Sequence, residues 1–416
     1  MEYITAQQAA QKWGISDRRV RILCAEGKIA GARKEGKSYR IPGNAVKPTD
    51  GRYKEDTNCR FLKWADHVIA AIQPDDEVTF TDPEYNEVVT LYTHGKSKWT
   101  SEQFTLFLAE RVVSRDRRDI ERILFRCGLS RYDVRKIAAI TRGMHPKDML
   151  WIAESRDERM EDVMTDVFQS VFLRAIDLQG DSIDTPEGYN IKRYGVWNGR
   201  YGIYKQRISP LTTDVESEIA VSLLGQRLGV PCCPAYRVDS RSVFSEFLYD
   251  FSKEYLVHFR RLFDGLRGEN EYQNLIGVRP EFRDDIARMI LLDFITRQDD
   301  RHLSNIAIKI SSAGESFYPL YDNGRSLFYE DTPEMVEAAV SDVAGYATTF
   351  GYEGSYWDCV QDIAAERGSL EGLLDLTVIR SEVEQILEVA GFSGYRFQGA
   401  TEWIMKSIEM IKEYGL

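Results

Sequence analysis

Two short stretches of this sequence decide its fold: Asp300-Arg301-His302-Leu303-Ser304-Asn305 and Tyr321-Asp322-Asn323-Gly324. Between them, residues 305–310 and 317–321 are mostly apolar, and the intervening residues are polar. This pattern predicts two strands joined by a turn. A hairpin brings its two ends together, so Asn305 and Asp322 should lie side by side. Converging carboxylate and amide oxygens suit Mg²⁺, which takes few protein ligands and keeps phosphates and waters as the others.

These residues also have an ordinary explanation. Asp and Asn are common turn residues, and Asp-Asn-Gly is a turn signal in its own right. The spacing of Asp300 and Asn305 gains weight because three further elements precede it in a fixed order. An aspartate that accepts a hydroxyl proton, followed by two magnesium ligands, is typical of phosphoryl-transfer enzymes.

The first of these elements is a lysine on a strand. Residues 190–197 and 200–207 are two β-like runs joined by Asn198-Gly199, which is the strongest short-range hairpin signal. Lys205 lies on the second run, where a lysine that faces a cleft can hold nucleotide phosphates. The alternative is a solvated surface lysine, the commoner position for this residue type.

The second element is a helix over residues 214–228. Its apolar residues recur near the helical period, and Gly229 and Pro231 end it. Glu218, near its start, could pair with Lys205, and Glu216 is the competing candidate. Either carboxylate could instead stabilise the helix N-terminus.

The third element is the turn-rich stretch over residues 184–190, directly before the hairpin. Gly188 would let backbone N–H groups approach phosphate oxygens, although a single glycine in a loop is more often part of a turn. Taken together, the order of loop, lysine hairpin, glutamate helix, Asp-Asn loop and second aspartate predicts phosphoryl transfer.

Residues 58–416 resemble the HipA-like protein kinases, the toxin kinases of bacterial toxin–antitoxin systems. The loop of that family has the form Asp-x-His-x-x-Asn, as Asp300, His302 and Asn305 do here. Its magnesium aspartate follows an apolar-Tyr pair, as in Leu320-Tyr321-Asp322.

Two further motifs of the family bear on this sequence. One is matched incompletely, and the other decides between the two candidate glutamates. Its phosphate loop has the form Gly-x-Gln-x-Lys, from which residues 188–192 depart by Asn190 in place of Gln. Its helix glutamate lies eleven residues before a Gly-apolar-Pro stop, which selects Glu218 over Glu216.

The resemblance implies an α+β, protein-kinase-like two-lobe fold and an ATP- and Mg²⁺-dependent Ser/Thr protein kinase. It also implies a protein substrate, an antitoxin partner and autophosphorylation in the phosphate loop, where Ser182 and Thr185 are the available hydroxyls. The implied site comprises Asp300 as the base, His302 in the loop motif, Lys205 and Glu218 at the phosphates, Asn305 and Asp322 at Mg²⁺, and Gly188, Asn190 and Lys192 in the phosphate loop. On physical grounds, we expect the imidazole of His302 to brace the loop by a hydrogen bond. The alternative, a general-base role, is less favoured because Asp300 already occupies that position.

The adenine-binding connector is assigned to residues 243–248, and Glu246, Phe247 and Leu248 are expected to contact the adenine ring. Backbone N–H and C=O groups would hold the adenine there, and the alternative is an ordinary internal strand. Other functions stay open: a DNA-binding regulator with a nucleotide-binding pseudokinase domain, an AMP-transferring enzyme, or a lipid or small-molecule kinase on the same fold.

The N-terminal residues form a separate module. Thr5 caps one predicted helix, and Ser16 caps a second, basic helix after Gly14, which together make a helix-turn-helix. Strands over residues 29–34 and 38–41 look like a wing. Residues 1 to about 52 thus resemble the excisionase/MerR-type winged helix-turn-helix. The resemblance implies DNA contacts from Arg18, Arg19 and Arg21 and from the wing residues Lys34, Lys37 and Arg40.

Charge agrees with this interpretation. Residues 1–54 carry 12 Lys and Arg against 5 Asp and Glu, a net charge of +7, whereas the rest of the chain has a net charge of −19. A basic module on an acidic protein is expected where phosphates are bound. The alternative is a basic, solvated module that binds a protein or its own kinase domain.

The predicted domains are residues 1–54, the DNA-binding module; 58–178, a mostly helical subdomain with a strand over 87–93; 179–250, the kinase N-lobe; and 251–416, the helical C-lobe. The six cysteines show no paired spacing, so reduced thiols in the cytoplasm are expected. We find no signal peptide and no apolar run near the ~18 residues of a membrane span, so no membrane association is expected.

Overall fold

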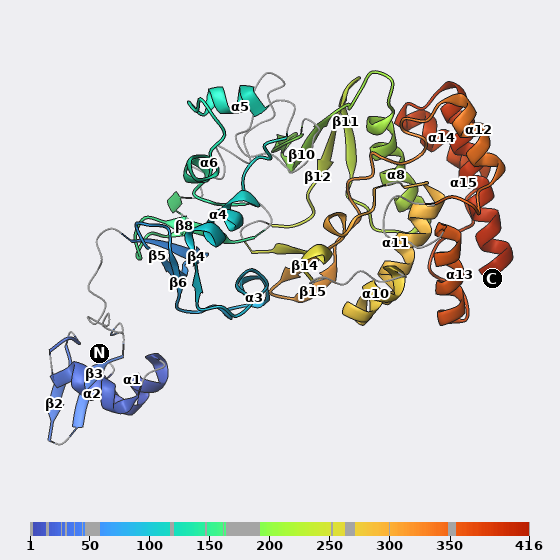
Figure 1. Cartoon of the computed structure of the whole chain (residues 1–416). Coiled ribbons are helices and arrows are strands. Elements are labelled where there is room, and N and C mark those ends of the chain that lie inside the picture. Colours follow the sequence, from blue (N-terminus) through green and yellow to red (C-terminus); the bar gives the residue numbers. More distant parts are fainter. Residues whose placement is uncertain are drawn as a thin grey trace. The chain divides into compact units, whose positions relative to one another are not determined.

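The computed structural model describes residues 3–13, 16–25, 27–29, 31–36, 38–43, 45, 59–116, 120–145, 148–160, 162–163, 192–250, 253–262, 271–298, 300–347 and 355–415. The chain divides into two compact units, Met1–Asn58 and Cys59–Leu416 (Figure 1). The further divisions predicted after residues 178 and 250 stay predictions. All six cysteines are free thiols. Within the described ranges, no helix combines the length and the hydropathy needed to cross a bilayer.

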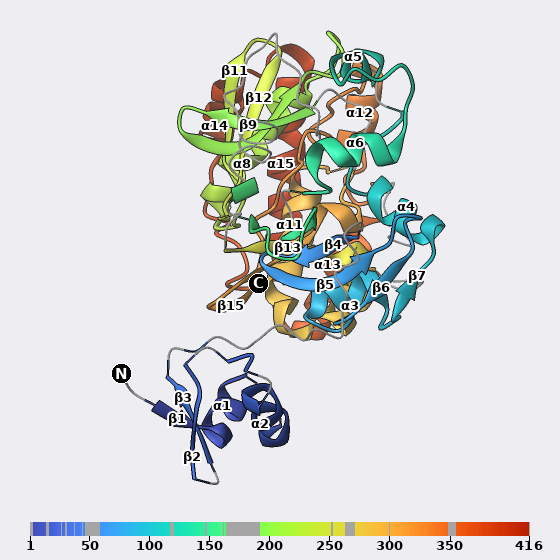
Figure 2. The same ribbon diagram turned by 90° about the vertical axis from the view of Figure 1, so that its left-hand side faces the viewer.

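The first unit combines two short helices with a small antiparallel sheet (Figure 2). The helices are α1 (Ala6–Trp13) and α2 (Asp17–Ala25), and the strands, in the order β1-β3-β2, are β1 (Tyr3–Thr5), β3 (Ser38–Pro42) and β2 (Arg33–Glu35). Both predicted helices and the predicted strand pair are present. The first wing strand begins later than expected because Ile29 lies in a turn and is buried in the core. Strand β1 was not predicted, since three residues are too few to show a period.

The second unit begins with a five-stranded antiparallel sheet, which the prediction of a mostly helical segment over residues 58–178 did not include. Its strands are β4 (Arg60–Trp64), β5 (His67–Ile72), β6 (Val78–Phe80), β7 (Lys98–Trp99) and β8 (Leu150–Ala153), in the order β7-β6-β5-β4-β8. All four residues of β8 are buried. A short strand without exposed positions shows no alternation of apolar and polar residues, which is why the sheet was missed.

Helices cover this sheet. Three of them are α4 (Ser101–Ala109), α5 (Ile120–Arg126) and α6 (Val134–Thr141). They share an apolar core with the sheet. The buried side chains of Trp64 and Trp99 belong to this core.

The strand predicted over residues 87–93 is wrong, because these residues form helix α3 (Glu87–Thr93). The β-branched run Val-Val-Thr favours a strand. However, the side chain of Asn86 caps the helix by accepting a hydrogen bond from the N–H of Val89 at 2.9 Å. Val88 and Val89 are buried against the five-stranded sheet. The cap and the packing therefore outweigh the local propensity.

The predicted lysine hairpin and glutamate helix are both confirmed. Strands β9 (Lys192–Trp197) and β10 (Arg200–Gln206) are joined by Asn198 and Gly199, which both have positive φ, as a tight hairpin turn requires. They continue into β12 (Ser242–Glu246) and β11 (Ala235–Asp239), giving the order β11-β12-β10-β9. Helix α8 (Asp214–Leu228) packs against β11 and β12 and ends at Gly229, whose φ is +77°.

A hairpin does follow the Asp-Asn loop, but its second strand lies earlier than predicted. Strands β14 (Ala307–Ser311) and β15 (Gly314–Phe317) pair, so β15 occupies part of the stretch predicted as the turn and only Phe317 of the predicted second strand belongs to it. Strand β13 (Tyr255–His258) adds to the outer side of β14. The short 3-10 helix η3 (Leu303–Asn305) ends the loop just before β14.

The remainder of the second unit is helical (Figure 1). The elements are α9 (Phe259–Leu262), α10 (Glu271–Val278), the 3-10 helix η2 (Pro280–Phe282), α11 (Arg283–Ile295), α12 (Pro333–Ser341), α13 (Tyr356–Arg367), α14 (Arg380–Ala390) and α15 (Gly394–Gly415). They pack around a large apolar core that includes α8. The chain after residue 332 contributes α12 to α15 to this core.

Candidate active site

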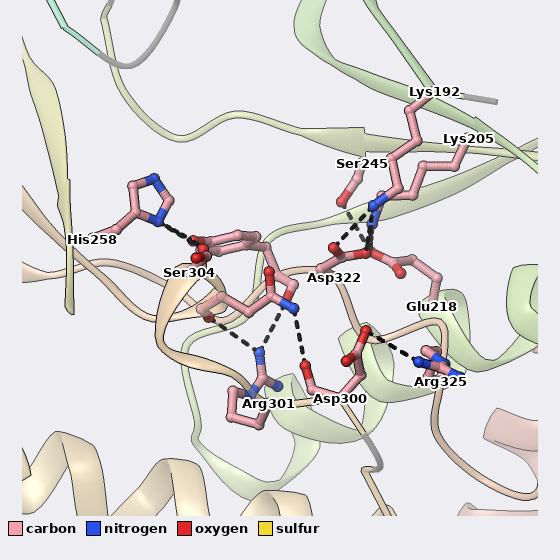
Figure 3. Close-up of polar contacts among 12 residues, drawn as sticks. Lys192, Lys205, Glu218, Ser245, His258, Asp300, Arg301, Ser304, Asp322 and Arg325 are labelled. Carbon is pink, nitrogen blue, oxygen red and sulfur yellow. Dashed lines mark hydrogen bonds and ion pairs between the residues drawn. The ribbon is translucent and has the colours of Figure 1, made fainter. Parts of the chain in front are cut away.

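Lys205 lies between two carboxylates (Figure 3). Its Nζ atom is 2.7 Å from Oε1 of Glu218 and 3.0 Å from Oδ1 of Asp322. The three side chains come from β10, from α8 and from the segment after β15. The fold thus brings together three residues that are far apart in the sequence and that were all predicted for the site.

The contacts also distinguish the two candidate glutamates. Glu216 accepts two hydrogen bonds from Arg207, at 2.5 and 2.6 Å, and lies 3.4 Å from Arg237. Glu218 is only 2% exposed, and its Oε1 atom also accepts a hydrogen bond from the hydroxyl of Ser245 at 3.3 Å. Of the two, Glu218 is therefore the one that contacts Lys205.

This difference predicts unequal effects of two matched substitutions. Glu218→Gln removes the charge that holds the Lys205 ammonium, so it should lower phosphoryl-transfer activity by about 10-fold or more, in line with the loss of a positioning contact. Glu216→Gln weakens the pair with Arg207 and should lower the melting temperature with little effect on activity per folded molecule. Activity and thermal unfolding of both variants check this. Equal loss of activity in the two variants would contradict it.

A second lysine contacts the same aspartate. Nζ of Lys192, at the start of β9, is 3.0 Å from Oδ2 and 3.4 Å from Oδ1 of Asp322 (Figure 3). Burial alone would raise the pKa of Asp322, but Lys192 and Lys205 outweigh burial and hold this pKa well below its usual range. Asp322 therefore stays ionised at any physiological pH.

The charge state of Lys205 follows from the same contacts. Burial alone would lower the pKa of the ammonium, but the carboxylates of Asp322 and Glu218 outweigh burial and hold this pKa above its ordinary value. Lys205 is therefore a permanent cation, as a phosphate ligand must be.

Asp300 has a different environment. Burial raises the pKa of its carboxyl group above the ordinary value, although His302 and Arg325 act in the opposite direction. Arg325 forms an ion pair with Asp300, its Nη1 atom lying 3.7 Å from Oδ2 of the carboxylate. The pKa of Asp300 is thus raised, whereas the pKa of Asp322 is lowered. Opposite shifts of this kind suit two different roles, with Asp322 as an ionised ligand and Asp300 as a proton acceptor.

The backbone of the loop fixes Asn305. The N–H of His302 donates to the carbonyl of Asp300 at 3.0 Å, and the N–H of Asn305 donates to the carbonyl of His302 at 2.7 Å. The Asn305 amide nitrogen also donates to the carbonyl of Asp300 at 3.0 Å. Because the amide nitrogen must face the Asp300 carbonyl to make this bond, the Oδ1 atom of Asn305 points away from that carbonyl.

Asn305 and Asp322 could supply two oxygens to a magnesium ion. Within the described part of the chain, no group of three or more His, Cys, Asp or Glu residues could hold a metal ion. Mg²⁺ needs only one or two protein oxygens when nucleotide phosphates supply others. A buried amide oxygen and an ionised carboxylate are such oxygens.

The other predicted nucleotide contacts stay predictions. Gly188, Asn190, Ser182 and Thr185 lie outside the described residues. In the predicted adenine connector, the N–H groups of Glu246, Phe247 and Leu248 donate to the carbonyls of Pro234 and Tyr201 and to the hydroxyl of Tyr318, respectively.

The N-terminal candidates are exposed cations. Arg18 and Arg21 lie on α2, Lys34 on β2 and Arg40 on β3. Arg21 pairs with Asp17 at 2.7 Å, and Arg40 pairs with Glu35 at 3.1 Å. Such exposed pairs are weak and can exchange for phosphate contacts. The side chain of Arg19 and the whole of Lys37 lie outside the described residues.

Sequence reasoning missed two arginines beside the site. Arg325 contacts Asp300 and also donates to the Tyr329 hydroxyl at 2.7 and 2.9 Å. Arg301, inside the Asp-Asn loop, is completely buried. No period or spacing in the sequence separates a buried arginine from the far commoner solvated one.

The comparisons with known proteins return distant structural similarity. The structure is similar to that of the Helicobacter pylori proinflammatory kinase CtkA, at 14% identity and a TM-score of 0.43, covering 59% of this chain and 93% of that chain. It is also similar to a chain of the Shewanella oneidensis MR-1 toxin–antitoxin complex of HipA, HipB and operator DNA, at 11% identity and a TM-score of 0.45, covering 86% of this chain and 100% of that chain. No protein-family model and no curated protein matches the sequence. Both similarities are weak, and neither by itself identifies a family.

Proposed function

We propose that the second unit, Cys59–Leu416, is an ATP- and Mg²⁺-dependent Ser/Thr protein kinase of the HipA-like type. The observation that carries this proposal is the position of the Lys205 ammonium between Glu218 and Asp322. A buried cation fixed by one carboxylate next to a second, ionised carboxylate is what phosphate binding beside a metal ligand requires.

Each remaining residue has a role that its environment supports. Asn305 and Asp322 would hold Mg²⁺, which, when bound, neutralises negative charge on the nucleotide phosphates. Lys205 and Lys192 would hold phosphate oxygens, with Glu218 fixing the position of Lys205. Asp300, whose pKa is raised by burial, would accept the proton of the attacking Ser or Thr hydroxyl on a carboxylate oxygen. The partners of such a kinase would be a protein substrate and an antitoxin.

Incubation of the purified chain with labelled ATP tests the proposal. Transfer of label from γ-labelled ATP to protein, dependent on Mg²⁺, is the expected result, with the label recovered as phosphoserine or phosphothreonine. Transfer from α-labelled ATP would instead indicate AMP transfer, and transfer from neither would favour a nucleotide-binding regulator. Mass spectrometry would locate autophosphorylation, for which Ser182 and Thr185 are the proposed sites.

We propose further that the first unit, Met1–Asn58, binds DNA and tethers the kinase to it. Residues 1–54 have a net charge of +7, and Arg18, Arg21, Lys34 and Arg40 are exposed. Phosphate contacts from such cations give affinity through counterion release. The arrangement of two helices and a three-stranded sheet is compatible with the winged helix-turn-helix that the sequence suggests.

This second proposal makes a salt-dependent prediction. DNA affinity of the full-length chain should fall steeply with salt, and the double variant Arg18→Glu, Lys34→Glu should make the plot of log affinity against log salt shallower by about 2, because two phosphate contacts are lost. Fluorescence anisotropy with duplex DNA measures both. The matched control is Lys253→Glu, Lys412→Glu, which reverses two exposed cations of the second unit. If the control variant lost as much affinity as the test variant, the first unit would not be the DNA-binding part.

A further inference from the structure

Arg301 makes an unusually complete set of contacts for a side chain inside a catalytic loop. It is 0% exposed. Its Nε and Nη2 atoms contact the carboxylate of Asp293, on α11, at 3.0 to 3.3 Å. Nη1 donates to the carbonyls of Tyr321, at 2.8 Å, and Asn305, at 3.4 Å, and Nη2 donates to Oδ1 of Asn323 at 2.6 Å.

These contacts lie on both sides of Asp322. The residue before it, Tyr321, is held through its carbonyl, and the residue after it, Asn323, is held through its side chain. Asp322 itself has a φ of +58°, a left-handed conformation that L-residues other than Gly, Asn and Asp rarely adopt. Such a conformation persists where the surroundings over-determine it. Arg301 supplies a contact on each side.

The same guanidinium reaches the other proposed metal ligand. Its Nη1 atom donates to the carbonyl of Asn305 as well as to that of Tyr321, so one rigid group touches both segments. Asp293 anchors the guanidinium to α11, whose apolar residues lie in the main core of the unit. The planar guanidinium carries five N–H donors in fixed directions and can contact all of these groups at once. A lysine ammonium cannot reproduce this arrangement of donors.

We infer that Arg301 is a positioning residue that fixes Asn305 and Asp322 relative to each other, and thereby sets the affinity of the site for Mg²⁺ without contacting the metal. This inference rests on the proposed kinase function. The competing explanation is a purely structural ion pair with Asp293, which would affect the stability of the fold but not the metal site.

The matched control for that explanation lies in the same unit. Arg111 is a second buried arginine that binds both oxygens of an aspartate, Asp148, at 2.6 and 2.7 Å. It also donates to the carbonyls of Gly143 and Leu150. Within the described part of the chain, its hydrogen bonds with Gly143, Tyr92, Asp148 and Leu150 lie outside the loop and the hairpin of the candidate site. Arg111→Lys should therefore reproduce the structural cost of losing a buried guanidinium and nothing more.

The experiment compares nucleotide binding with and without metal in the full-length chain. Calorimetry would measure the affinity for a non-hydrolysable ATP analogue in Mg²⁺ and in EDTA, and thermal unfolding would verify folding. In the wild type, Mg²⁺ should strengthen binding. In Arg301→Lys, this enhancement should shrink by about 10- to 100-fold, as for loss of an outer contact to metal ligands, while affinity in EDTA changes little.

A second variant covers the case in which Arg301→Lys does not fold. Asn323→Ala removes only one acceptor, and the Nη2 atom of Arg301 still contacts Asp293. Its enhancement by Mg²⁺ should fall by about 3- to 10-fold, a smaller loss than that from removing the whole guanidinium. Arg111→Lys should lower the melting temperature and keep the full enhancement.

The possible outcomes separate the two ideas. If folded Arg301→Lys and Asn323→Ala kept the wild-type enhancement, Arg301 would be a structural residue and the kinase proposal would be unaffected. If Arg111→Lys lost the enhancement as well, general destabilisation would explain the effect, and the inference would be wrong. If the wild type bound the analogue equally with and without Mg²⁺, the proposed metal site itself would be wrong, and the inference would fall with it.

Discussion

Replacing Asp300 with Asn should slow phosphoryl transfer by about 10²–10⁴-fold, the usual contribution of a general base, while nucleotide binding is retained. The Asp300 carboxylate contacts Arg325 at 3.7 Å, whereas the ion pairs of Lys192 and Lys205 with Asp322 are made by a different carboxylate. Removing the charge of Asp300 therefore takes away the proposed proton acceptor and leaves these lysine–Asp322 pairs in place. Single-turnover kinetics with ATP, together with calorimetry on a non-hydrolysable analogue, measure the two effects separately.

A matched control is Asp285→Asn. Asp285 is a second aspartate whose pKa burial raises, and it pairs with Arg288 on α11. Its replacement removes a partly buried carboxylate of similar character at a position without predicted chemistry, so turnover should stay near the wild-type value. Near wild-type turnover in Asp300→Asn would mean that the loop has been misinterpreted.

Replacing Asp322 with Asn should have a comparably large effect through a different step. The substitution removes a metal ligand charge worth several kcal/mol, so phosphoryl transfer should fall by about 10³-fold or more at one tenfold per 1.36 kcal/mol. The enhancement of nucleotide binding by Mg²⁺ should be lost with it. Asparagine tolerates a left-handed backbone as aspartate does, so the change tests the charge and not the φ of +58°.

The chain offers a close control for this substitution. Asp76 also has a positive φ, +68°, and also contacts two basic side chains, Arg60 and Arg135. It lies in the turn between β5 and β6. Asp76→Asn should therefore change stability alone. If Asp322→Asn kept a normal magnesium dependence in kinase assays at varied Mg²⁺, Asp322 would not be the metal ligand.

The elements with strong local signals were predictable from the sequence. Asn198-Gly199 specified a tight turn, and Gly229 specified the end of α8, because both depend on backbone conformations that few residues adopt. The residues of the candidate site followed from the same elements, since a hairpin and a helix with known ends restrict where Lys205, Glu218 and Asp322 can lie.

What escaped prediction depends on tertiary packing. Helix α3 forms from a β-branched run because Asn86 caps it and the sheet buries Val88 and Val89. The N–H of Leu248 donates to the hydroxyl of Tyr318, seventy positions away in the sequence. The burial of Arg301 likewise arises from Asp293, Tyr321 and Asn323 meeting in space, which no local pattern encodes.

The pair of lysines on Asp322 has a thermodynamic consequence. Lys192 and Lys205 both lie within 3.4 Å of this carboxylate, so a free divalent cation meets a ligand whose charge is already compensated. Nucleotide phosphates give the two ammonium groups an alternative partner. The carboxylate of Asp322 is then less compensated and can bind the metal ion more strongly. Binding of either ligand should then favour binding of the other by the same factor, because such coupling is reciprocal. A kinase built in this way would respond to the concentration of the metal–nucleotide complex and remain insensitive to free magnesium when nucleotide is scarce.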